Sequence, residues 1–117
     1  MKDSSVEIFG DGEQLRDFTY VGDVVRVITD SIENKTSNES PINLAFNQKI
    51  SVNEISRLLK KVVPDLQVKY LDNRKGDIRD SLSDGELINK IYPHIKPTNF
   101  EDNLVRTFKW IKTNFIS

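Results

Sequence analysis

The sequence predicts a small α/β domain, or an α+β domain in isolation, with a mixed sheet of about four short strands and four helices. Two observations support this prediction. Short segments of alternating apolar and polar residues, typical of strands, are interleaved with longer segments whose apolar residues recur at helical spacing. Three of the helical segments follow a serine or threonine with glutamate three residues later, the capping-box signature of a helix start. The 117 residues correspond to one domain, residues 1–117, by usual domain size.

A strand and a glycine turn are expected near the N-terminus. Residues 6–9 (Val-Glu-Ile-Phe) alternate in the manner of a strand. Gly10 and Gly12 follow, and both tolerate the positive φ of a tight turn. Residues 18–21 (Phe-Thr-Tyr-Val) are aromatic and β-branched, so a second strand is expected there.

A helix should follow this second strand. Asp23 is expected to cap it, and its end should lie near residue 33. Its apolar face is formed by Val24, Val27, Ile28 and Ile32. A polar loop over residues 34–41 ends in proline, and residues 42–46 (Ile-Asn-Leu-Ala-Phe) are expected to form a third strand.

The second half begins with a helix that Ser51 should cap together with Glu54. Pro64 ends this helix, and residues 67–71 alternate as a fourth strand. Two further capping boxes, at residues 83–86 and 98–101, predict a short third helix and a final helix. The final helix carries its apolar stripe on Phe100, Leu104, Phe108, Ile111 and Phe115.

Composition excludes several classes of function. Seventeen basic and eighteen acidic residues leave a net charge of −1 without a basic block, so neither nucleic acid nor a membrane is an expected partner. The chain has no cysteine, which excludes disulfides and thiolate chemistry. No apolar segment has the length of a membrane span or the pattern of a signal peptide. We expect a cytoplasmic protein without a metal site.

Few residues are candidates for catalysis. The single histidine, His94, lies between two prolines and is expected to be solvated. Tyr92 and Lys96 are four residues apart in the sequence. Pro93 argues against a helix through this segment, so we interpret the spacing as chance.

Two segments carry residues suited to an anionic ligand. In residues 10–25, Arg16 follows the glycine turn, where its planar fork can face a phosphate; the alternative is that Arg16 and Asp17 only fix the loop. In residues 74–77, Arg74 and Asp77 flank a glycine and suit a phosphate and sugar hydroxyls. The alternative there is a solvated charged loop.

The order of these motifs resembles a known family. Residues 10–25 nearly match a family consensus. Further matches follow at Asn43, in the helix opened by Ser51, at residues 74–77, at residues 83–84, and in the closing helix at Asn103, Leu104, Thr107 and Trp110. The chain resembles the C-terminal, substrate-binding part of the NAD-dependent epimerase/dehydratase family, the extended short-chain dehydrogenases/reductases that act on nucleotide sugars. It departs from the family at Gly22, where aspartate is usual, and at Asn47, where glycine is.

The resemblance implies a ligand and its contacts. Arg16 and Arg74 match arginines that contact the nucleotide-sugar diphosphate, and Asp77 matches the acidic residue that binds the ribose hydroxyls. The implied fold is the C-terminal substrate domain of these enzymes. Positions expected to shape turns and helix starts are Gly10, Gly12, Asp17, Asp23 and Ser51.

The resemblance also implies what the chain lacks. The family seats NAD with a glycine fingerprint and transfers protons with a tyrosine–lysine pair, and both should lie upstream of Met1 in an N-terminal NAD-binding Rossmann domain absent here. We therefore expect a truncated chain without a cofactor, inactive alone. Its face over residues 23–47 should bind a separate NAD-binding domain, self-associate or be mobile. The alternatives are a non-catalytic interaction or dimerisation module and half of an enzyme completed by a separate NAD-binding chain.

Overall fold

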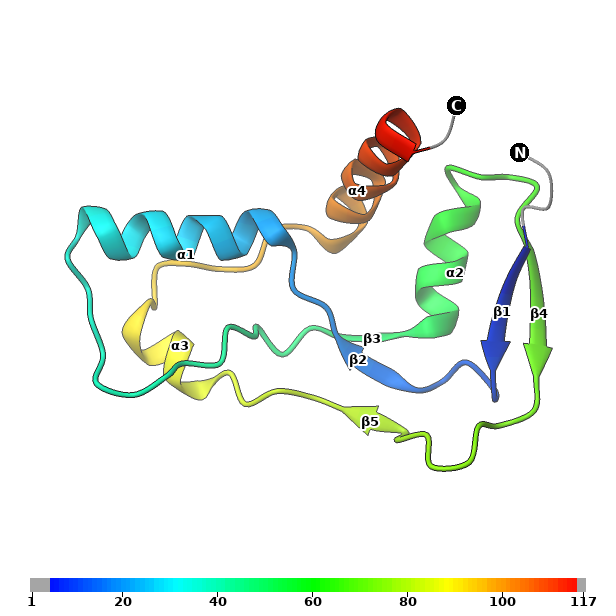
Figure 1. The fold of residues 1–117 in the computed structure, drawn as a ribbon, viewed down its shortest axis with the longest axis horizontal. Coiled ribbons are helices and arrows are strands. Elements are labelled where there is room, and N and C mark those ends of the chain that lie inside the picture. Colours follow the sequence, from blue (N-terminus) through cyan, green and yellow to red (C-terminus); the bar gives the residue numbers. More distant parts are fainter. Residues whose placement is uncertain (1–4, 116–117) are drawn as a thin grey trace.

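A computed structural model describes residues 5–115, which form five short strands and four helices in mixed order (Figure 1). The predicted α/β class is confirmed, with one strand more than expected. The elements are β1 (Ser5–Phe9), β2 (Leu15–Asp17), α1 (Val21–Glu33), β3 (Lys49–Ser51), α2 (Val52–Lys60), β4 (Gln67–Leu71), β5 (Asp80–Ser81), α3 (Glu86–Ile91) and α4 (Phe100–Phe115). Within residues 5–115 no helix is long and apolar enough to cross a membrane.

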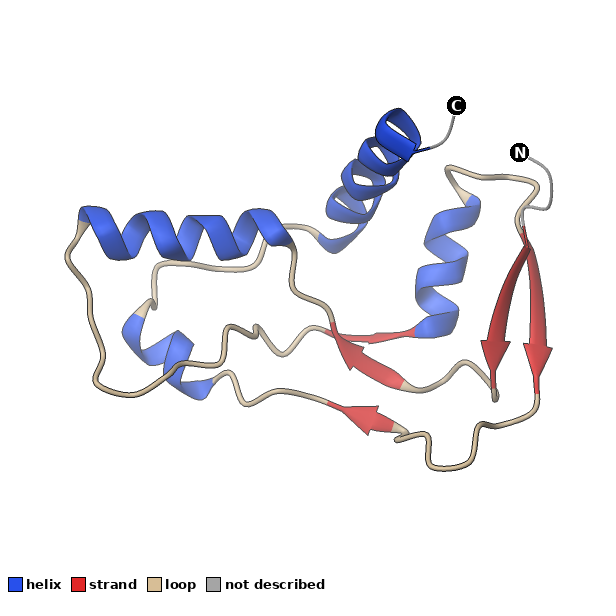
Figure 2. Cartoon of the chain, in the orientation of Figure 1, coloured by secondary structure: helices blue, strands red, loops and turns tan. Residues whose placement is uncertain are grey.

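The strands form two small sheets (Figure 2). In the first, β1 and β4 pair in parallel, with Phe9 opposite Leu71 at their carboxyl ends. Parallel pairing requires a crossover connection, and the connection here includes α2. In the second, β2 lies between β3, which is antiparallel to it, and β5, which is parallel.

The largest buried cluster lies between α1 and α3. Its centre is formed by Val27, Ile88, Tyr92 and Ile95, and the residues packed around it are Ile42, Leu44, Phe46 and Ile91. Residues 42–46, expected as a strand, contribute three of these side chains without joining either sheet. Their apolar pattern reflects burial against α3 rather than strand pairing, so the third-strand prediction is wrong.

The second predicted strand is displaced toward the N-terminus. The strand is Leu15–Asp17, and residues 18–20 leave the sheet before α1 begins. Phe18 instead packs against Phe100, with ring centroids 5.9 Å apart, and Thr19 Oγ1 donates to the carbonyl of Leu44. The aromatic and β-branched side chains that indicated a strand therefore serve tertiary packing.

Asp17 fixes the turn that returns the chain to β3. Its two carboxylate oxygens accept hydrogen bonds from the backbone amides of Asn47 and Gln48, both at 3.1 Å. Asn47 has a φ of 56°, a left-handed conformation in which asparagine and glycine are favoured. Asparagine is thus a tolerable replacement for glycine at this position.

Three helices begin next to a side chain that accepts a hydrogen bond from a first-turn amide. In one of them, α2, this side chain is the predicted capping serine. Ser51 Oγ accepts from the amide of Glu54 at the start of α2. At α3 the acceptor is Asp84 Oδ1, which bonds the Glu86 amide, rather than Ser83. At α4 it is Asn99 Oδ1, which bonds the Asp102 amide.

Thr98, the residue expected to cap α4, bonds Asp23 instead. Asp23 was expected to cap α1, but the residue in that position is Tyr20. Asp23 lies in the first turn with 2% of its surface exposed. Its carboxylate accepts from the amide and hydroxyl of Thr98 at 3.0–3.1 Å and from Arg26 Nη1 at 3.0 Å. A hydrogen bond to an ionised carboxylate is stronger than a neutral one, and Thr98 Oγ1 also accepts from Asn103 Nδ2 at 2.7 Å.

The described chain is open rather than spherical. Its Cα radius of gyration is 16.9 Å, whereas a compact domain of this length has about 13 Å. The extents are 48 × 35 × 19 Å, and the C-terminal half of α4 projects from the body (Figure 1). Much side-chain surface therefore remains uncovered within the described residues.

Candidate functional site

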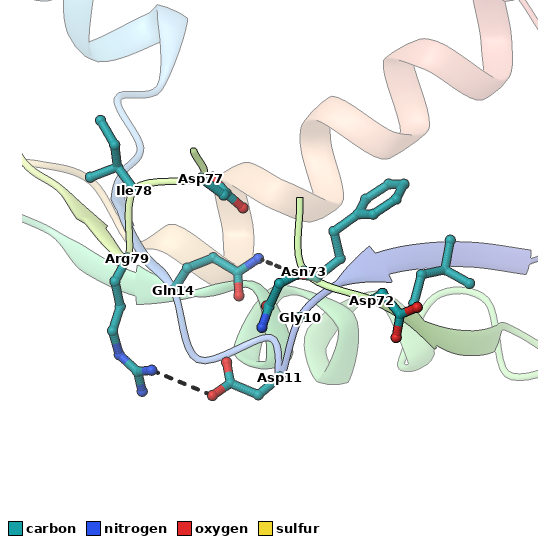
Figure 3. Close-up of a pocket in the computed structure, with 10 residues that line it drawn as sticks. Gly10, Asp11, Gln14, Asp72, Asn73, Asp77, Ile78 and Arg79 are labelled. Carbon is teal, nitrogen blue, oxygen red and sulfur yellow. Dashed lines mark hydrogen bonds and ion pairs between the residues drawn. The ribbon is translucent and has the colours of Figure 1, made fainter. Parts of the chain in front are cut away.

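A cavity of about 610 Å³ lies at the carboxyl ends of β1 and β4 (Figure 3). The end of β1, the 10–14 turn and the 71–79 segment line it. In α/β proteins, ligands typically bind outside the carboxyl ends of the strands. The cavity therefore occupies a favourable place for a ligand.

The glycine turn forms one wall of this cavity. Gly10 and Gly12 have φ values of 82° and 75°, which only glycine adopts readily. A side chain at Gly12 would collide with Asn53. Asn53 Nδ2 donates to the carbonyl of Asp11, and Gln14 Nε2 donates to the carbonyl of Phe9. The turn is thus held from both sides.

Arg16 and Asp77, predicted from two distant motifs, are in contact. Arg16 Nη2 lies 3.2 Å from Asp77 Oδ1. Arg16 Nη1 donates to the carbonyls of Leu15 and Arg79 at 2.9 and 3.1 Å. The structure thus joins β2 to the 74–77 segment through the Arg16 fork.

Arg74 lies next to Phe9, the last residue of β1. Its guanidinium carbon is 3.6 Å from the centroid of the Phe9 ring, a cation–π contact. The amide of Asp77 donates to the carbonyl of Arg74, and Gly76 between them has a φ of 86°. Arg74 therefore contacts two residues that line the cavity, Phe9 and Asp77, without lining it itself.

Two further residues were not singled out from the sequence: Arg79, which lines the cavity, and Asn53, which bonds the glycine turn. Arg79 Nη1 lies 3.6 Å from Asp11 Oδ2 across the cavity (Figure 3). Asn53 accepts a hydrogen bond from Tyr70 while donating to the turn. Arg79 could have been found, because it lies two residues beyond Asp77 in the same polar run. Nothing in the sequence marks Asn53, which lies inside a capping box.

These groups suit recognition of an anion bearing hydroxyl groups. Arginine forks bind phosphate oxygens with two hydrogen bonds, and a carboxylate accepts from sugar hydroxyls. Within residues 5–115 no three His, Cys, Asp or Glu side chains are placed to hold a metal ion.

The tyrosine and lysine at catalytic spacing lie elsewhere. α3 ends at Ile91, so Tyr92 and Lys96 do not share a helix. Tyr92 is buried, with its hydroxyl 2.7 Å from Ser31 Oγ. His94, expected to be solvated, remains exposed but bonds Asp30 at 2.8 Å. These residues join α1 to the segment after α3.

A second region of note is apolar. We call it the α1–α4 apolar surface and define it by the exposed residues Val21, Val25, Ile28, Ile32 and Trp110. A cavity of about 540 Å³ between Val21 and Trp110 connects the two helices. The predicted apolar face was only partly right: Ile28 and Ile32 are exposed, whereas Val27 is buried and Val24 half-buried.

Comparison with known proteins shows that the chain is similar to part of several nucleotide-sugar enzymes. A profile of the NAD dependent epimerase/dehydratase family matches residues 1–45. A UDP-glucuronate 4-epimerase from Thermodesulfobacterium geofontis is 31% identical over 115 residues, which are 97% of this chain and 35% of that protein.

Solved structures agree with this placement. The UDP-N-acetylglucosamine 4-epimerase of Methanobrevibacter ruminantium, in complex with UDP-N-acetylmuramic acid, matches with a TM-score of 0.79 and 37% identity over 95% of this chain and 36% of that one. The UDP-glucose 4-epimerase of Thermotoga maritima, with UDP-glucose, matches with a TM-score of 0.78 and 32% identity over 93% of this chain and 35% of that one.

These matches define the class: the chain is built like part of the α/β nucleotide-sugar epimerases and dehydratases. It belongs to the NAD-dependent epimerase/dehydratase family. It spans about a third of the length of the curated relatives it matches.

The family name implies NAD, and the residues described here do not fit it. A dinucleotide pyrophosphate sits on a helix N-terminus that follows a strand and a glycine-rich turn. The one pair of glycines two residues apart in the sequence, Gly10 and Gly12, connects β1 to β2 rather than a strand to a helix. The described residues therefore offer this cofactor no such cradle.

Proposed function

We propose that this chain is the C-terminal, substrate-binding part of a nucleotide-sugar epimerase or dehydratase. Arg16 and Arg74 bind the diphosphate of the nucleotide sugar, and Asp77 binds its ribose hydroxyls. The observation that carries the proposal is the contact between Arg16 and Asp77, which are 61 residues apart in sequence, beside the cavity at the ends of β1 and β4.

Charge and geometry support this assignment. Arg16 and Arg74 approach the cavity from different elements, β2 and the segment after β4. A diphosphate spreads its charge over several oxygens, which two separate arginines can share with charge-assisted hydrogen bonds. Asp77 lines the cavity and contacts both arginine residues, Arg16 through its carboxylate and Arg74 through its backbone amide. The Phe9 ring under Arg74 keeps that guanidinium beside the cavity.

The chain is proposed to bind but not to convert the ligand by itself. Its sequence contains no glycine fingerprint for NAD, and Tyr92 and Lys96 do not form a helical pair. The affinity of residues 1–117 alone should be weak, because we propose that a second domain completes the site.

Titration calorimetry with UDP-glucose tests the assignment. Arg16→Ala and Arg74→Ala should each weaken binding about tenfold, because a hydrogen bond to a charged group contributes roughly 1.5–3 kcal/mol. Arg106→Ala is the matched control, since Arg106 lies in α4 beside Trp110 and should leave the affinity unchanged. Equal affinities for all four proteins would contradict the proposal.

A second function is favoured by the α1–α4 apolar surface. We propose that this surface docks the NAD-binding part of the family fold, on the same or a separate polypeptide. Exposed apolar stripes of this kind mark interaction sites, and the large radius of gyration indicates missing packing. When the chain is mixed with a separately produced NAD-binding domain, both proteins should sediment together as a faster complex. Homodimers of the chain alone, without a mixed complex, would support the dimerisation module instead.

A further inference from the structure

The two groups proposed to hold different parts of the ligand are bonded to each other. Arg16 Nη2 lies 3.2 Å from Asp77 Oδ1, and Arg16 Nη1 donates to two backbone carbonyls. A diphosphate requires the fork of Arg16, and a ribose requires the carboxylate of Asp77. The same atoms therefore serve an internal contact and the proposed ligand contact.

Two ion pairs join the 72–79 segment to β2 and to the glycine turn. One is Arg16–Asp77, and the other joins Arg79 to Asp11 at 3.6 Å. Both pairs are partly solvated, with side-chain exposures of 29% and 38% for Arg16 and Asp77. Exposed pairs of this kind are weak, so a multiply charged ligand can displace them.

Residues 74–77 of this segment form an exposed turn. Gly76 has a φ of 86°, and a side chain there would meet nothing within 4 Å. The turn is held to the body by the Arg16–Asp77 pair and by the contact of Arg74 with the Phe9 ring. Breaking the Arg16–Asp77 pair would release Arg16 toward the cavity without disturbing a buried group.

We infer that the Arg16–Asp77 ion pair is a latch, which the diphosphate must open before Arg16 and Asp77 bind their separate parts of the ligand. This inference rests on the proposed function of the pocket. A brace is the opposing account: Asp77 would hold Arg16 in the orientation that the diphosphate needs. The two accounts predict opposite effects of removing the Asp77 charge.

Titration with inorganic pyrophosphate separates them, because this ligand has no ribose for Asp77 to bind. Asp77→Asn should bind pyrophosphate about two- to fivefold more tightly than the wild type, the gain expected from releasing an exposed ion pair. Asp77→Ala should show the same gain, which guards against a local effect of the amide. Weaker binding by both variants would establish the brace and overturn the latch.

A matched control separates the effect of losing the ion pair from the effect of losing one negative charge near the cavity. Asp72 also lines the cavity and forms no ion pair with another residue of the described range. Asp72→Asn changes the net charge equally, so its gain should be smaller than that of Asp77→Asn. Equal gains would mean that charge alone acts, and would overturn the latch.

A parallel titration with UDP distinguishes failure of the latch from failure of the proposed function. Loss of the ribose acceptor should make Asp77→Asn prefer UDP over pyrophosphate less strongly than the wild type does. If the wild type binds neither ligand at millimolar concentration, the proposed function fails and the latch with it. If it binds both and Asp77→Asn shows no gain, only the latch fails.

Discussion

The pocket at the ends of β1 and β4 and the α1–α4 apolar surface differ in whether their side chains have partners within the chain. In the pocket, Arg16, Arg74 and Arg79 each have a partner within the chain. On the apolar surface, Ile32 is 73% exposed and Trp110 59% exposed. The charged side chains at the pocket are thus paired within the chain, whereas large apolar side chains of the α1–α4 apolar surface are left exposed.

Asp23 links the elements that carry the apolar surface. Its carboxylate joins α1 to the segment before α4 through Thr98. Asp23→Ala should lower the free energy of unfolding by about 2–3 kcal/mol, because buried donors lose their acceptor. Urea denaturation measures this loss.

Asp102→Ala is the control for that change. Asp102 is exposed in the first turn of α4, and its removal should cost about 0.5 kcal/mol. Equal losses for the two variants would show that Asp23 is not the link between α1 and α4.

Substitutions in the glycine turn beside the pocket should destabilise the chain. Gly12→Ala should destabilise the chain by roughly 1–3 kcal/mol, because alanine is strained at positive φ and its methyl would displace Asn53. Gly76→Ala carries the same φ penalty without a neighbour for the methyl group. A smaller loss for Gly76→Ala, measured by thermal unfolding, would isolate the Asn53 contact; a larger one would contradict it.

The apolar surface should tolerate polar substitution in the isolated chain. Val25→Asn combined with Ile28→Asn should change the free energy of unfolding by less than about 0.5 kcal/mol, because both side chains are already exposed. The wild type should self-associate with rising concentration in sedimentation, and the double variant should remain monomeric. A strongly destabilised double variant would show that this face is packed.

The smallest expected effect is a pH dependence away from both regions. The hydrogen bond from Arg57 lowers the pKa of Glu54 below its ordinary value of 4.5. A carboxylate with a lowered pKa contributes stability above its unfolded pKa and loses it as the pH falls through the folded pKa. Urea midpoints of the wild type and Glu54→Gln should therefore converge as the pH falls below 4.5. A constant difference would contradict the pairing.

Local patterns predicted most elements of the fold. β1, α2 and β4 lie where periodicity and the Ser51 capping box predict them. The failures share one cause, since residues 18–21 and 42–46 have strand-forming side chains that pack against helices distant in sequence. Such contacts depend on topology, which short-range patterns do not contain.

The site was partly accessible from the sequence. Arg16, Arg74 and Asp77 were chosen by their resemblance to family motifs. In the structure Asp77 lines the cavity, Arg16 bonds Asp77, and Arg74 contacts Phe9, which also lines the cavity. Their roles toward a ligand stay predictions. The mutual engagement of Arg16 and Asp77 was not predictable, because it joins β2 to a loop 61 residues away.

The most direct measurement is backbone amide shift mapping during titration with a UDP-sugar. The account predicts that shifts concentrate at Arg16 and residues 74–77, with smaller changes along the glycine turn and none along α1. Shifts confined to α1 and α4, or no response at millimolar ligand, would contradict it.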